Sequence, residues 1–447
     1  MISSYIQAQR ELEALPSIAE YMDRKKHPAA YLQRTQMLLK ELKHPERGFS
    51  VIHIGGTAGK GSVTMFLHYI LAASDKKVGA FISPHVTTAV ERTLIDTRPI
   101  STKDFVWAWE KVKKAITRLT DRHGHNAAPS YFEAQYAMSL LLFHKYHVRW
   151  ITLEVGCGGE FDATNTIPAP RATIITNIHL DHMQLLGKTR AQIAKTKSGI
   201  IKSKSVIFTG EINATIRRII ENCSQKARAT CRFVKKPTYP ISIHTDQMEW
   251  QHPNLGKLSS HLLGSHQLHN AEIAIAVAQY LKLPKKAIKN GIAKTRIPAR
   301  SEIMQHKPIV LIDGAHNPAK VESLVRLLRS FNVKKKHAVI GIGHNKQICQ
   351  MLHVLIPQFA HICFTNASLE DPKPASAHEL LRIAQNLYPK KKFLMHTDPL
   401  QAYKKILTKS HPQDLIVVTG SLYLSGEIRT RWIPESNILK THNLFLS

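Results

Sequence analysis

The chain has 447 residues, of which 43% are hydrophobic and 21% charged, a balance typical of a globular protein with a sizeable core and two or three domains. Its apolar runs are far shorter than a membrane span and its first residues include no apolar signal segment, so we expect a cytoplasmic protein that does not associate with membranes. The formal net charge is +30, but the lysines form scattered pairs and triples without an RNA-binding or zinc-finger motif, so we interpret them as a solvated surface and expect no nucleic-acid partner. A positive field would also attract polyanionic small substrates.

The first 300 residues alternate between helical and strand patterns. Apolar residues recur every three or four positions within residues 1–47, as in a helix, and buried strands are predicted at 51–54, 150–155 and 172–178. Helices are predicted at 131–146 and 269–281, and the polar segment 235–262 is expected to form loops or a small antiparallel sheet. Strands alternating with helices indicate a mostly parallel, doubly wound sheet of the phosphate-loop type.

A second alternation of predicted strands and helices begins near Pro298. Its predicted strands lie at 309–313, 337–343, 361–366, 392–397 and 414–420, and residues 319–331 show the apolar face of a helix. We therefore predict an α/β protein with two domains. The first, residues 1–297, binds the nucleotide, and the second, residues 298–447, is a smaller Rossmann-like domain.

The stretch VIHIGGTAGKGSVTMFLHYIL, residues 51–71, has the pattern of a phosphate-binding loop. A strand runs into glycines, which let backbone N–H groups approach an anion, and the helix that follows directs the positive end of its dipole there. Lys60 adds a charge for the phosphates and Ser62 a hydroxyl for phosphate or Mg²⁺. The spacing departs from the strict Walker A motif. The predicted phosphate-binding residues are Gly56, Thr57, Ala58, Gly59, Lys60, Gly61 and Ser62.

Reactive side chains also follow two other predicted strands. Glu154 ends one of them before a glycine-rich turn, and Asp181 with His182 comes just after the next. Because ligands of a doubly wound sheet bind at the carboxyl ends of its strands, these side chains are expected to converge beside the phosphate loop as Mg²⁺ ligands or their supports.

A set of motifs occurs in the order found in one enzyme family. These are GGTAGKGS, SPHV, YFEAQ, LEVGCGGEFDATN, LDH, KSGIIK, GSHQLHN, PARSE, DGAHNP and VTGSLYLSGEIR. From about residue 5 to about residue 432, the chain resembles the folylpolyglutamate synthase/dihydrofolate synthase family of the Mur ligase superfamily. The resemblance implies an ATP-dependent, ADP-forming ligase of folate biosynthesis. A carboxylate of dihydropteroate or of a folylglutamate becomes an acyl phosphate, which the amino group of L-glutamate attacks.

The resemblance also assigns roles to individual residues. It implies ATP and two Mg²⁺ ions, with Lys197 carbamylated, and a monomeric enzyme. The implied catalytic residues are Lys60, Glu154, His182 and Lys197, and the implied metal ligands are Ser62, Ser83, Glu154, His182 and Lys197. Further ATP contacts fall on Asn270, Arg300, Asp313, His316 and Asn317. The residues that the resemblance implies as contacts of the pterin part of the substrate are Ser130, Tyr131, Phe132, Glu133, Phe161, Asp162 and Ala163.

Three departures from the family pattern concern the loop and the acceptor. Ala58 stands for the usual Asn of the phosphate loop, Glu160 for an Arg after the glycines, and residues 31–34 read Tyr-Leu-Gln-Arg instead of Gly-Leu-Glu-Arg. Two alternatives therefore stay open, a Mur-type ligase for a non-folate acceptor and, because of the net charge, a nucleic-acid-binding protein on a ligase scaffold. If the chain is a folate ligase, it could add glutamate to dihydropteroate, to a folylglutamate, or to both.

Overall fold

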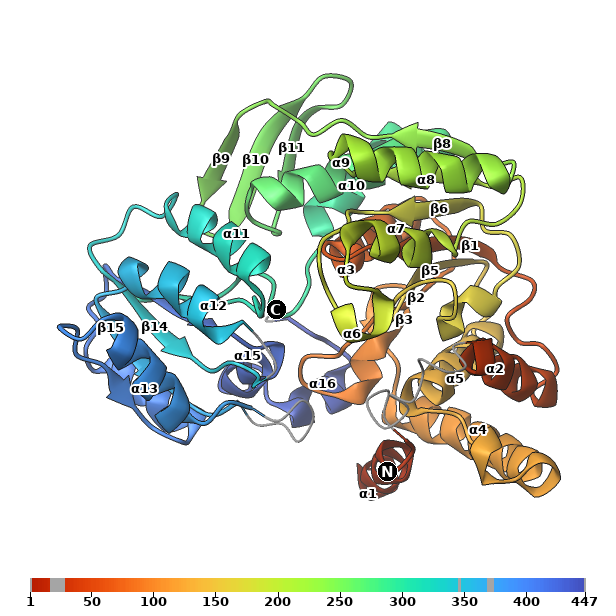
Figure 1. The fold of residues 1–447 in the computed structure, drawn as a ribbon, viewed down its shortest axis with the longest axis horizontal. Helices are drawn as coiled ribbons and strands as arrows, with labels where there is room; N and C mark the ends of the chain where they lie inside the picture. The colour runs from red at the N-terminus through yellow and green to blue at the C-terminus, as the bar shows by residue number, and fades with distance from the viewer. Residues whose placement is uncertain (1, 17–28, 345–346, 368–373, 446–447) are drawn as a thin grey trace. The chain divides into compact units, whose positions relative to one another are not determined.

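The computed structural model describes residues 2–16, 29–344, 347–367 and 374–445 (Figure 1). Contacts divide the chain into two compact units. The first unit comprises residues 1–85, 89–238 and 269–292, and the second comprises 86–88, 239–268 and 293–447. This division assigns 239–268 to the second unit, and the domain boundary at residue 297 stays a prediction.

The first unit is built on an eight-stranded sheet. Six strands are parallel, in the order β2-β5-β1-β6-β7-β8, and β3 and β4 extend the β2 edge in antiparallel fashion. In sheet order the strands are β4 (Arg98–Pro99), β3 (Thr93–Ile95), β2 (Val78–Phe81), β5 (Trp150–Glu154), β1 (Ser50–Gly55), β6 (Ala172–Ile175), β7 (Val206–Thr209) and β8 (Thr230–Phe233). The central strands β1, β5 and β6 are almost wholly buried, which explains their near-continuous apolar sequences.

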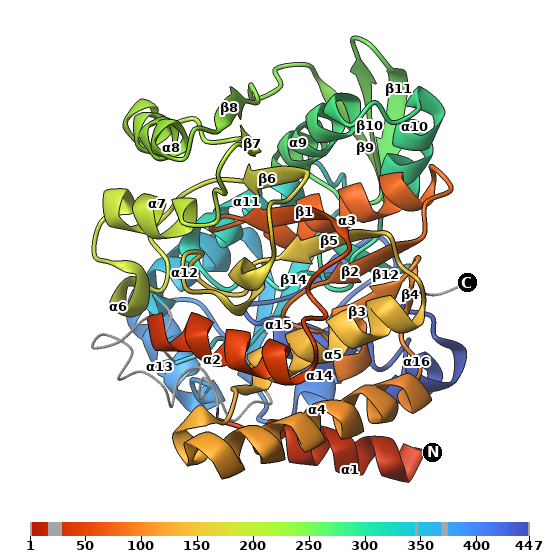
Figure 2. The same ribbon diagram turned by 90° about the vertical axis from the view of Figure 1, so that its right-hand side faces the viewer.

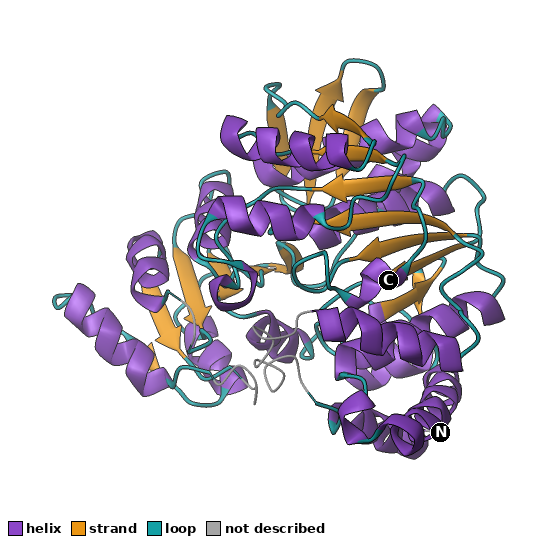
Figure 3. Ribbon diagram, turned by 45° about the vertical axis from the view of Figure 1, so that its right-hand side comes forward, coloured by secondary structure: helices purple, strands orange, loops and turns teal. Residues whose placement is uncertain are grey.

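Helices cover both faces of this sheet, as Figure 3 shows with strands in orange and helices in purple. In Figure 2, α9 and α10 lie above the central strands β6 and β1, and α4 and α5 lie below them. The helices are α1 (Ile2–Glu13), α2 (Ala29–Glu41), α3 (Lys60–Ala72), α4 (Thr102–His123), α5 (Tyr131–Lys145), α6 (Met183–Leu186), α7 (Arg190–Ser198), α8 (Ala214–Lys226), α9 (Ser265–Tyr280) and α10 (Lys285–Lys294), the last two with a few residues in the second unit. Glycines permit close packing at two places, where Gly291 of α10 meets Ile70 of α3 and Gly79 of β2 meets Phe143 of α5.

The second unit contains two sheets. A three-stranded antiparallel sheet consists of β9 (Ile241–His244), β10 (Gln247–His252) and β11 (Gly256–Ser260). A six-stranded sheet follows the order β12 (Glu302–His306), β13 (Ile309–Ile312), β17 (Leu415–Thr419), β14 (Lys336–Ile340), β15 (His361–Phe364) and β16 (Leu394–Met395), all parallel except β12. Its helices are α11 (Pro318–Leu328), α12 (Ile348–Leu355), α13 (Ala377–Leu387), α14 (Pro399–Leu407), α15 (Leu422–Arg429) and α16 (Glu435–Thr441).

The α/β fold predicted from the sequence is confirmed. Each strand predicted from an apolar run corresponds to β1, β5, β6, β13, β14, β15, β16 or β17, and 235–262 includes the antiparallel sheet. The predicted helix at 269–281 begins four residues earlier, at Ser265. Among the described residues, no helix combines the length and the apolar character needed to cross a lipid bilayer.

Candidate active site

The glycine-rich loop joins the carboxyl end of β1 to the first turn of α3, so its backbone lies at the edge of the sheet where ligands bind. Gly56 and Gly59 have φ angles of 136° and 82°, which side chains of L-residues rarely adopt. A Cβ atom at Gly56 would collide with the Thr176 hydroxyl, and one at Gly59 with the Asn270 side-chain oxygen. Both positions therefore require glycine. The Asn270 side chain lies against Gly59 of the loop, and its contact with ATP stays a prediction.

The segment after β6 holds this loop in place. The backbone N–H of Thr57 donates to the Asn177 carbonyl at 2.8 Å, and that of Ala58 donates to Asn177 Oδ1 at 2.9 Å. The Thr176 hydroxyl donates to the Ala58 carbonyl at 2.7 Å. The loop thus keeps its conformation without a side-chain amide at residue 58, which explains how the family's Asn is replaced by Ala58.

The first turn of α3 presents backbone donors for an anion. Gly59 is the N-cap, and no side chain caps the helix. The N–H groups of Lys60, Gly61 and Ser62 precede the first intrahelical bond, which Val63 donates to Gly59. Uncapped N–H groups at a helix N-terminus are a binding site for phosphate. The turn therefore has the local geometry of an anion-binding helix N-terminus, and its binding of ATP stays a prediction.

Glu154 lies close to the first turn of α3. It ends β5, is 5% exposed, and its Oε2 accepts a hydrogen bond from the Ser83 N–H at 3.1 Å. A Cβ atom on Gly61 would lie 3.5 Å from the same oxygen. The structure thus brings together two predicted Mg²⁺ ligands, Ser83 and Glu154, with the helix turn that carries Ser62.

His182 differs from the other predicted metal ligands. Its side chain is half exposed, and its Nε2 lies 3.9 Å from Oδ1 of the neighbouring Asp181. The described residues contain no group of three or more His, Cys, Asp or Glu side chains spaced to hold a metal ion. A second Mg²⁺ at His182 stays a prediction.

Lys197 contacts the phosphate loop directly. Its side chain extends from α7, and Nζ donates to the Gly56 carbonyl at 2.9 Å. Only 3% of the residue is exposed. Burial, with a further contribution from the positive charge of Lys60, lowers the pKa of the Lys197 amine to about 8. The glycine-rich turn after β5 permits this placement, because a Cβ at Gly159 would lie 2.8 Å from the Lys197 carbonyl.

The predicted pterin-side residues at the start of α5 have clear structural contacts. Ser130 and Glu133 form a capping box, in which the Ser130 N–H donates to Glu133 Oε2 at 2.6 Å. Arg34 donates two further hydrogen bonds to Glu133, both 2.9 Å long, in a buried pair. The side chain of Phe132 lies against Gly156 and 5.4 Å from the Phe81 ring. The departure at 31–34 retains its Arg, whose role here is to hold Glu133.

The second pterin-side segment contains a buried carboxyl group. Asp162 accepts hydrogen bonds from the N–H groups of Cys157 and Thr164, at 2.9 and 3.0 Å, and burial raises its pKa above the usual range. His53 Nε2 lies 2.9 Å from the Thr164 hydroxyl, which itself contacts Asp162. Phe161 is half-buried and Ala163 buried beside Asp162. The predicted residues therefore form one ordered turn.

Sequence reasoning did not identify His53, Thr176 and Asn177. His53 is fully buried in β1, and the other two follow β6 directly. The available signal was a polar side chain inside an apolar strand or just after its carboxyl end, the same signal that indicated Glu154, Asp181 and His182.

The remaining predicted ATP residues lie in the second unit. Asp313 Oδ2 accepts hydrogen bonds from the Ser301 N–H and hydroxyl, at 2.8 and 2.9 Å. Asn317 caps α11 through the Lys320 N–H, and His316 Nε2 lies 3.0 Å from Lys320 Nζ. Asp313, His316 and Asn317 follow β13, so the turn at the carboxyl end of this strand contains charged and polar side chains.

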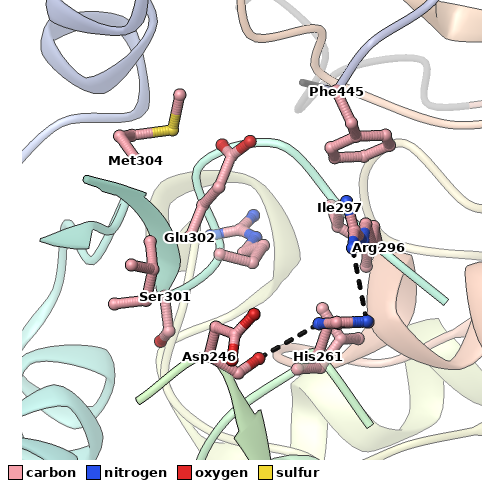
Figure 4. A pocket seen from close by; sticks show the side chains of 11 residues that line it. Asp246, His261, Arg296, Ile297, Ser301, Glu302, Met304 and Phe445 are labelled. Carbon is pink, nitrogen blue, oxygen red and sulfur yellow. Dashed lines mark hydrogen bonds between the residues drawn. The ribbon is translucent and has the colours of Figure 1, made fainter. Parts of the chain in front are cut away.

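Arg300 lines a pocket of the second unit (Figure 4). In this pocket His261 lies between Asp246 and Arg296, with its Nδ1 3.1 Å from the Asp246 carbonyl and its Nε2 3.4 Å from Arg296 Nη2. Phe445 forms another part of the wall. The pocket adjoins the turn at Asp313, because Ser301 lines the pocket and its hydroxyl also donates to Asp313.

Comparisons with known proteins identify the family. Residues 54–278 match the Mur ligase middle domain, and residues 299–422 match the Mur ligase glutamate ligase domain. The folylpolyglutamate synthase of Lacticaseibacillus casei is 30% identical over 413 residues, which cover 89% of this chain and 93% of that protein. The chain belongs to the Mur ligase family, among the folylpolyglutamate and dihydrofolate synthases.

Other relatives agree with this assignment. The Bacillus subtilis dihydrofolate synthase/folylpolyglutamate synthase is 29% identical over 418 residues, which cover 90% of this Mur ligase and 94% of that relative. The crystal structure of Mycobacterium tuberculosis folylpolyglutamate synthase complexed with ADP and AMPPCP superimposes with a TM-score of 0.85. It shares 27% identity, and the match covers 97% of this chain and 99% of that one. The family predicted from the motifs is confirmed.

Proposed function

We propose that this Mur ligase joins L-glutamate to dihydropteroate, to a folylglutamate, or to both, with ATP converted to ADP and phosphate. The observation that supports this most directly is the convergence of Lys197 and Glu154 on the loop of Gly56 to Ser62. The proposed substrates are those of the related dihydrofolate and folylpolyglutamate synthases, and one of the similar structures contains ADP.

The proposed reaction has two steps. An oxygen of the acceptor carboxylate attacks the γ-phosphorus of ATP, and the bond from that phosphorus to the bridging oxygen of ADP breaks. The amino group of L-glutamate then attacks the carbonyl carbon of the acyl phosphate, loses a proton, and releases inorganic phosphate. In the first step, Lys60 and the N–H groups of α3 stabilise the charge that develops on the transferred phosphoryl group.

Two groups outside the chain belong to this proposal. Mg²⁺ would be held by Ser62, Ser83 and Glu154, whose oxygen atoms suit a hard cation, and would neutralise phosphate charge when bound. His182 is proposed for the second ion. Lys197 is proposed to be carbamylated, since the lowered pKa of its buried amine leaves a substantial neutral fraction that can react with CO₂ near neutral pH. The carbamate carboxylate would then face the phosphate loop.

We further propose a cytoplasmic monomer with two catalytic domains, residues 1–297 and 298–447, and without a nucleic-acid partner. Arg300, Asp313, His316 and Asn317 are proposed to contact ATP from the second domain. Asp313, His316 and Asn317 follow the carboxyl end of β13, and Ser301, the neighbour of Arg300, donates to Asp313, which supports this role.

The test is glutamate-dependent ADP release by the purified full-length protein with Mg-ATP and bicarbonate. One reaction receives 7,8-dihydropteroate and the other a reduced folylmonoglutamate. Turnover in the first indicates dihydrofolate synthesis, in the second polyglutamylation, and in both a bifunctional enzyme. ATP binding without turnover on either acceptor would refute the folate proposal. Turnover with a UDP-linked acceptor would then select the other Mur ligase reaction.

A further inference from the structure

Arg92 is unusual among the buried arginines of the described residues. Three arginines are buried there, Arg34, Arg92 and Arg429, with exposed fractions of 7%, 8% and 0%. Arg34 forms a two-point ion pair with Glu133, and Arg429 forms one with Glu302. Within the described part of the chain, Arg92 has no carboxylate within 4.0 Å.

The surroundings fix the guanidinium group of Arg92 in one orientation. Its backbone ends a 3₁₀ turn at Ala89–Arg92, and its carbonyl accepts a hydrogen bond from the Ile82 N–H at 3.0 Å. Its Nε donates to His85 Nδ1 at 2.9 Å. An imidazole side chain carries no negative charge, so His85 leaves the charge of Arg92 uncompensated. The guanidinium carbon also lies 4.9 Å from the centroid of the Tyr131 ring.

A buried cation without an anion costs stability, so its retention calls for another explanation. The Nε donor and one face of the group are in use, whereas the described residues supply no hydrogen-bond acceptor for the two Nη groups. Two Nη groups in one plane match the two oxygens of a carboxylate. A negatively charged ligand would therefore both neutralise and complete the site.

The position of Arg92 relates this site to the substrates. Tyr131, which it stacks on, is one of the predicted pterin-side residues. His85 lies two residues after Ser83, whose N–H binds Glu154 at the proposed metal site. Arg92 thus contacts one residue of the segment proposed for the acceptor, Tyr131, and one residue, His85, that is near the proposed metal ligand Ser83 in the sequence.

We propose that Arg92 is a substrate-binding residue that holds a carboxylate group of a reactant. This inference rests on the proposed function, which supplies two carboxylate sources, the pteroyl acceptor and L-glutamate. Arg92 binds the reacting molecule through paired Nη–H donors, and His85 with Tyr131 holds the guanidinium in place.

The first experiment replaces Arg92 by Gln in the full-length protein and varies each substrate separately. If the acceptor supplies the carboxylate, wild-type protein binds dihydropteroate about 10- to 100-fold more tightly than its methyl ester, and Arg92→Gln removes this preference. If L-glutamate supplies it, KM for glutamate rises by a similar factor while the preference for the acid over the ester stays. In both cases KM for ATP stays within about twofold. Equal changes for all three substrates, or no change, would overturn the proposal.

The second measurement distinguishes binding from a purely structural role. Removing an uncompensated charge leaves the ligand-free Arg92→Gln protein at least as stable as the wild type, whereas Arg34→Gln, which breaks an ion pair, lowers the unfolding midpoint. A loss of stability in Arg92→Gln equal to that in Arg34→Gln would contradict the inference. Arg98→Gln, at an exposed position of β4, is the control for charge alone and leaves all parameters unchanged.

The outcomes also separate this inference from the proposed function. Binding of dihydropteroate and its methyl ester is measured without turnover, by quenching of protein fluorescence. If wild-type protein releases no ADP but distinguishes acid from ester through Arg92, the carboxylate site holds and the ligase proposal fails. If turnover occurs with Arg92→Gln indistinguishable from wild type, the ligase proposal holds and the carboxylate site fails.

Discussion

The buried amine of Lys197 predicts how carbamylation depends on pH. CO₂ adds to the neutral amine, so the rate follows the neutral fraction. With a pKa of about 8, roughly a quarter of Lys197 is neutral at about pH 7.5, against about one part in a thousand for a lysine with the ordinary pKa of 10.5. The structure therefore predicts a rate advantage of roughly 200-fold over an exposed lysine near neutral pH.

The sign of the pH dependence follows from the same lowered pKa. Below pH 8 each further unit of acidity reduces the neutral fraction about tenfold, so activation slows. Above pH 8 the amine is mostly neutral, and the rate levels off. Protein depleted of CO₂ is mixed with ¹³C-labelled bicarbonate at a fixed concentration of dissolved CO₂. The carbamate is followed by ¹³C NMR and the recovery of activity by glutamate-dependent ADP release.

Lys195 provides the matched control, because it lies in the same helix with an exposed side chain. Lys197→Met removes both the labelled carbamate and the recovery of activity, whereas Lys195→Met leaves them unchanged. A rate that continues to rise up to about pH 10.5 would show an ordinary amine and refute the reasoning. Full activity in the absence of CO₂ would refute the role of the carbamate.

Three further substitutions test the loop and the buried ion pair. Lys60→Ala is expected to lower kcat by about 10²- to 10³-fold with a small change in stability, because the transferred phosphoryl group loses a charged donor. Gly59→Ala is expected to cost about 1–2 kcal/mol of backbone strain and to raise KM for ATP about tenfold, since its Cβ collides with Asn270. Glu133→Gln is expected to lower the free energy of unfolding by about 3–5 kcal/mol in urea titrations, because Arg34 is left buried without its carboxylate.

Each of these expectations has a measurement that would contradict it. An unchanged kcat in Lys60→Ala or an unchanged KM for ATP in Gly59→Ala would remove the loop from the nucleotide site. For the ion pair, Glu322→Gln is the control, because Glu322 and Arg326 form an exposed pair with side chains 55% and 57% accessible. It is expected to cost less than about 1 kcal/mol. Equal losses in both variants would show that burial of the Arg34 pair contributes nothing.

Local patterns were sufficient for the strands that long apolar runs form and for the phosphate loop. Apolar runs such as residues 51–54 and 414–420 become strands because a parallel sheet buries both faces. The glycines of the loop are visible in the sequence because their backbone conformation excludes other residues. The family motifs then indicated Lys60, Glu154 and Lys197 as members of one site.

Only the tertiary structure decided which side chains meet. Lys197 bonds to the Gly56 carbonyl across 141 positions, and Arg34 pairs with Glu133 across 99. The same holds for the charge of Arg92, since a sequence does not reveal that, among the residues which the structure describes, two buried arginines have a carboxylate partner and the third has none. Strand order and helix packing determine these distances, and burial then determines their energetic consequences. The sequence therefore determined the kind of chemistry, and the fold determined where its charges are balanced.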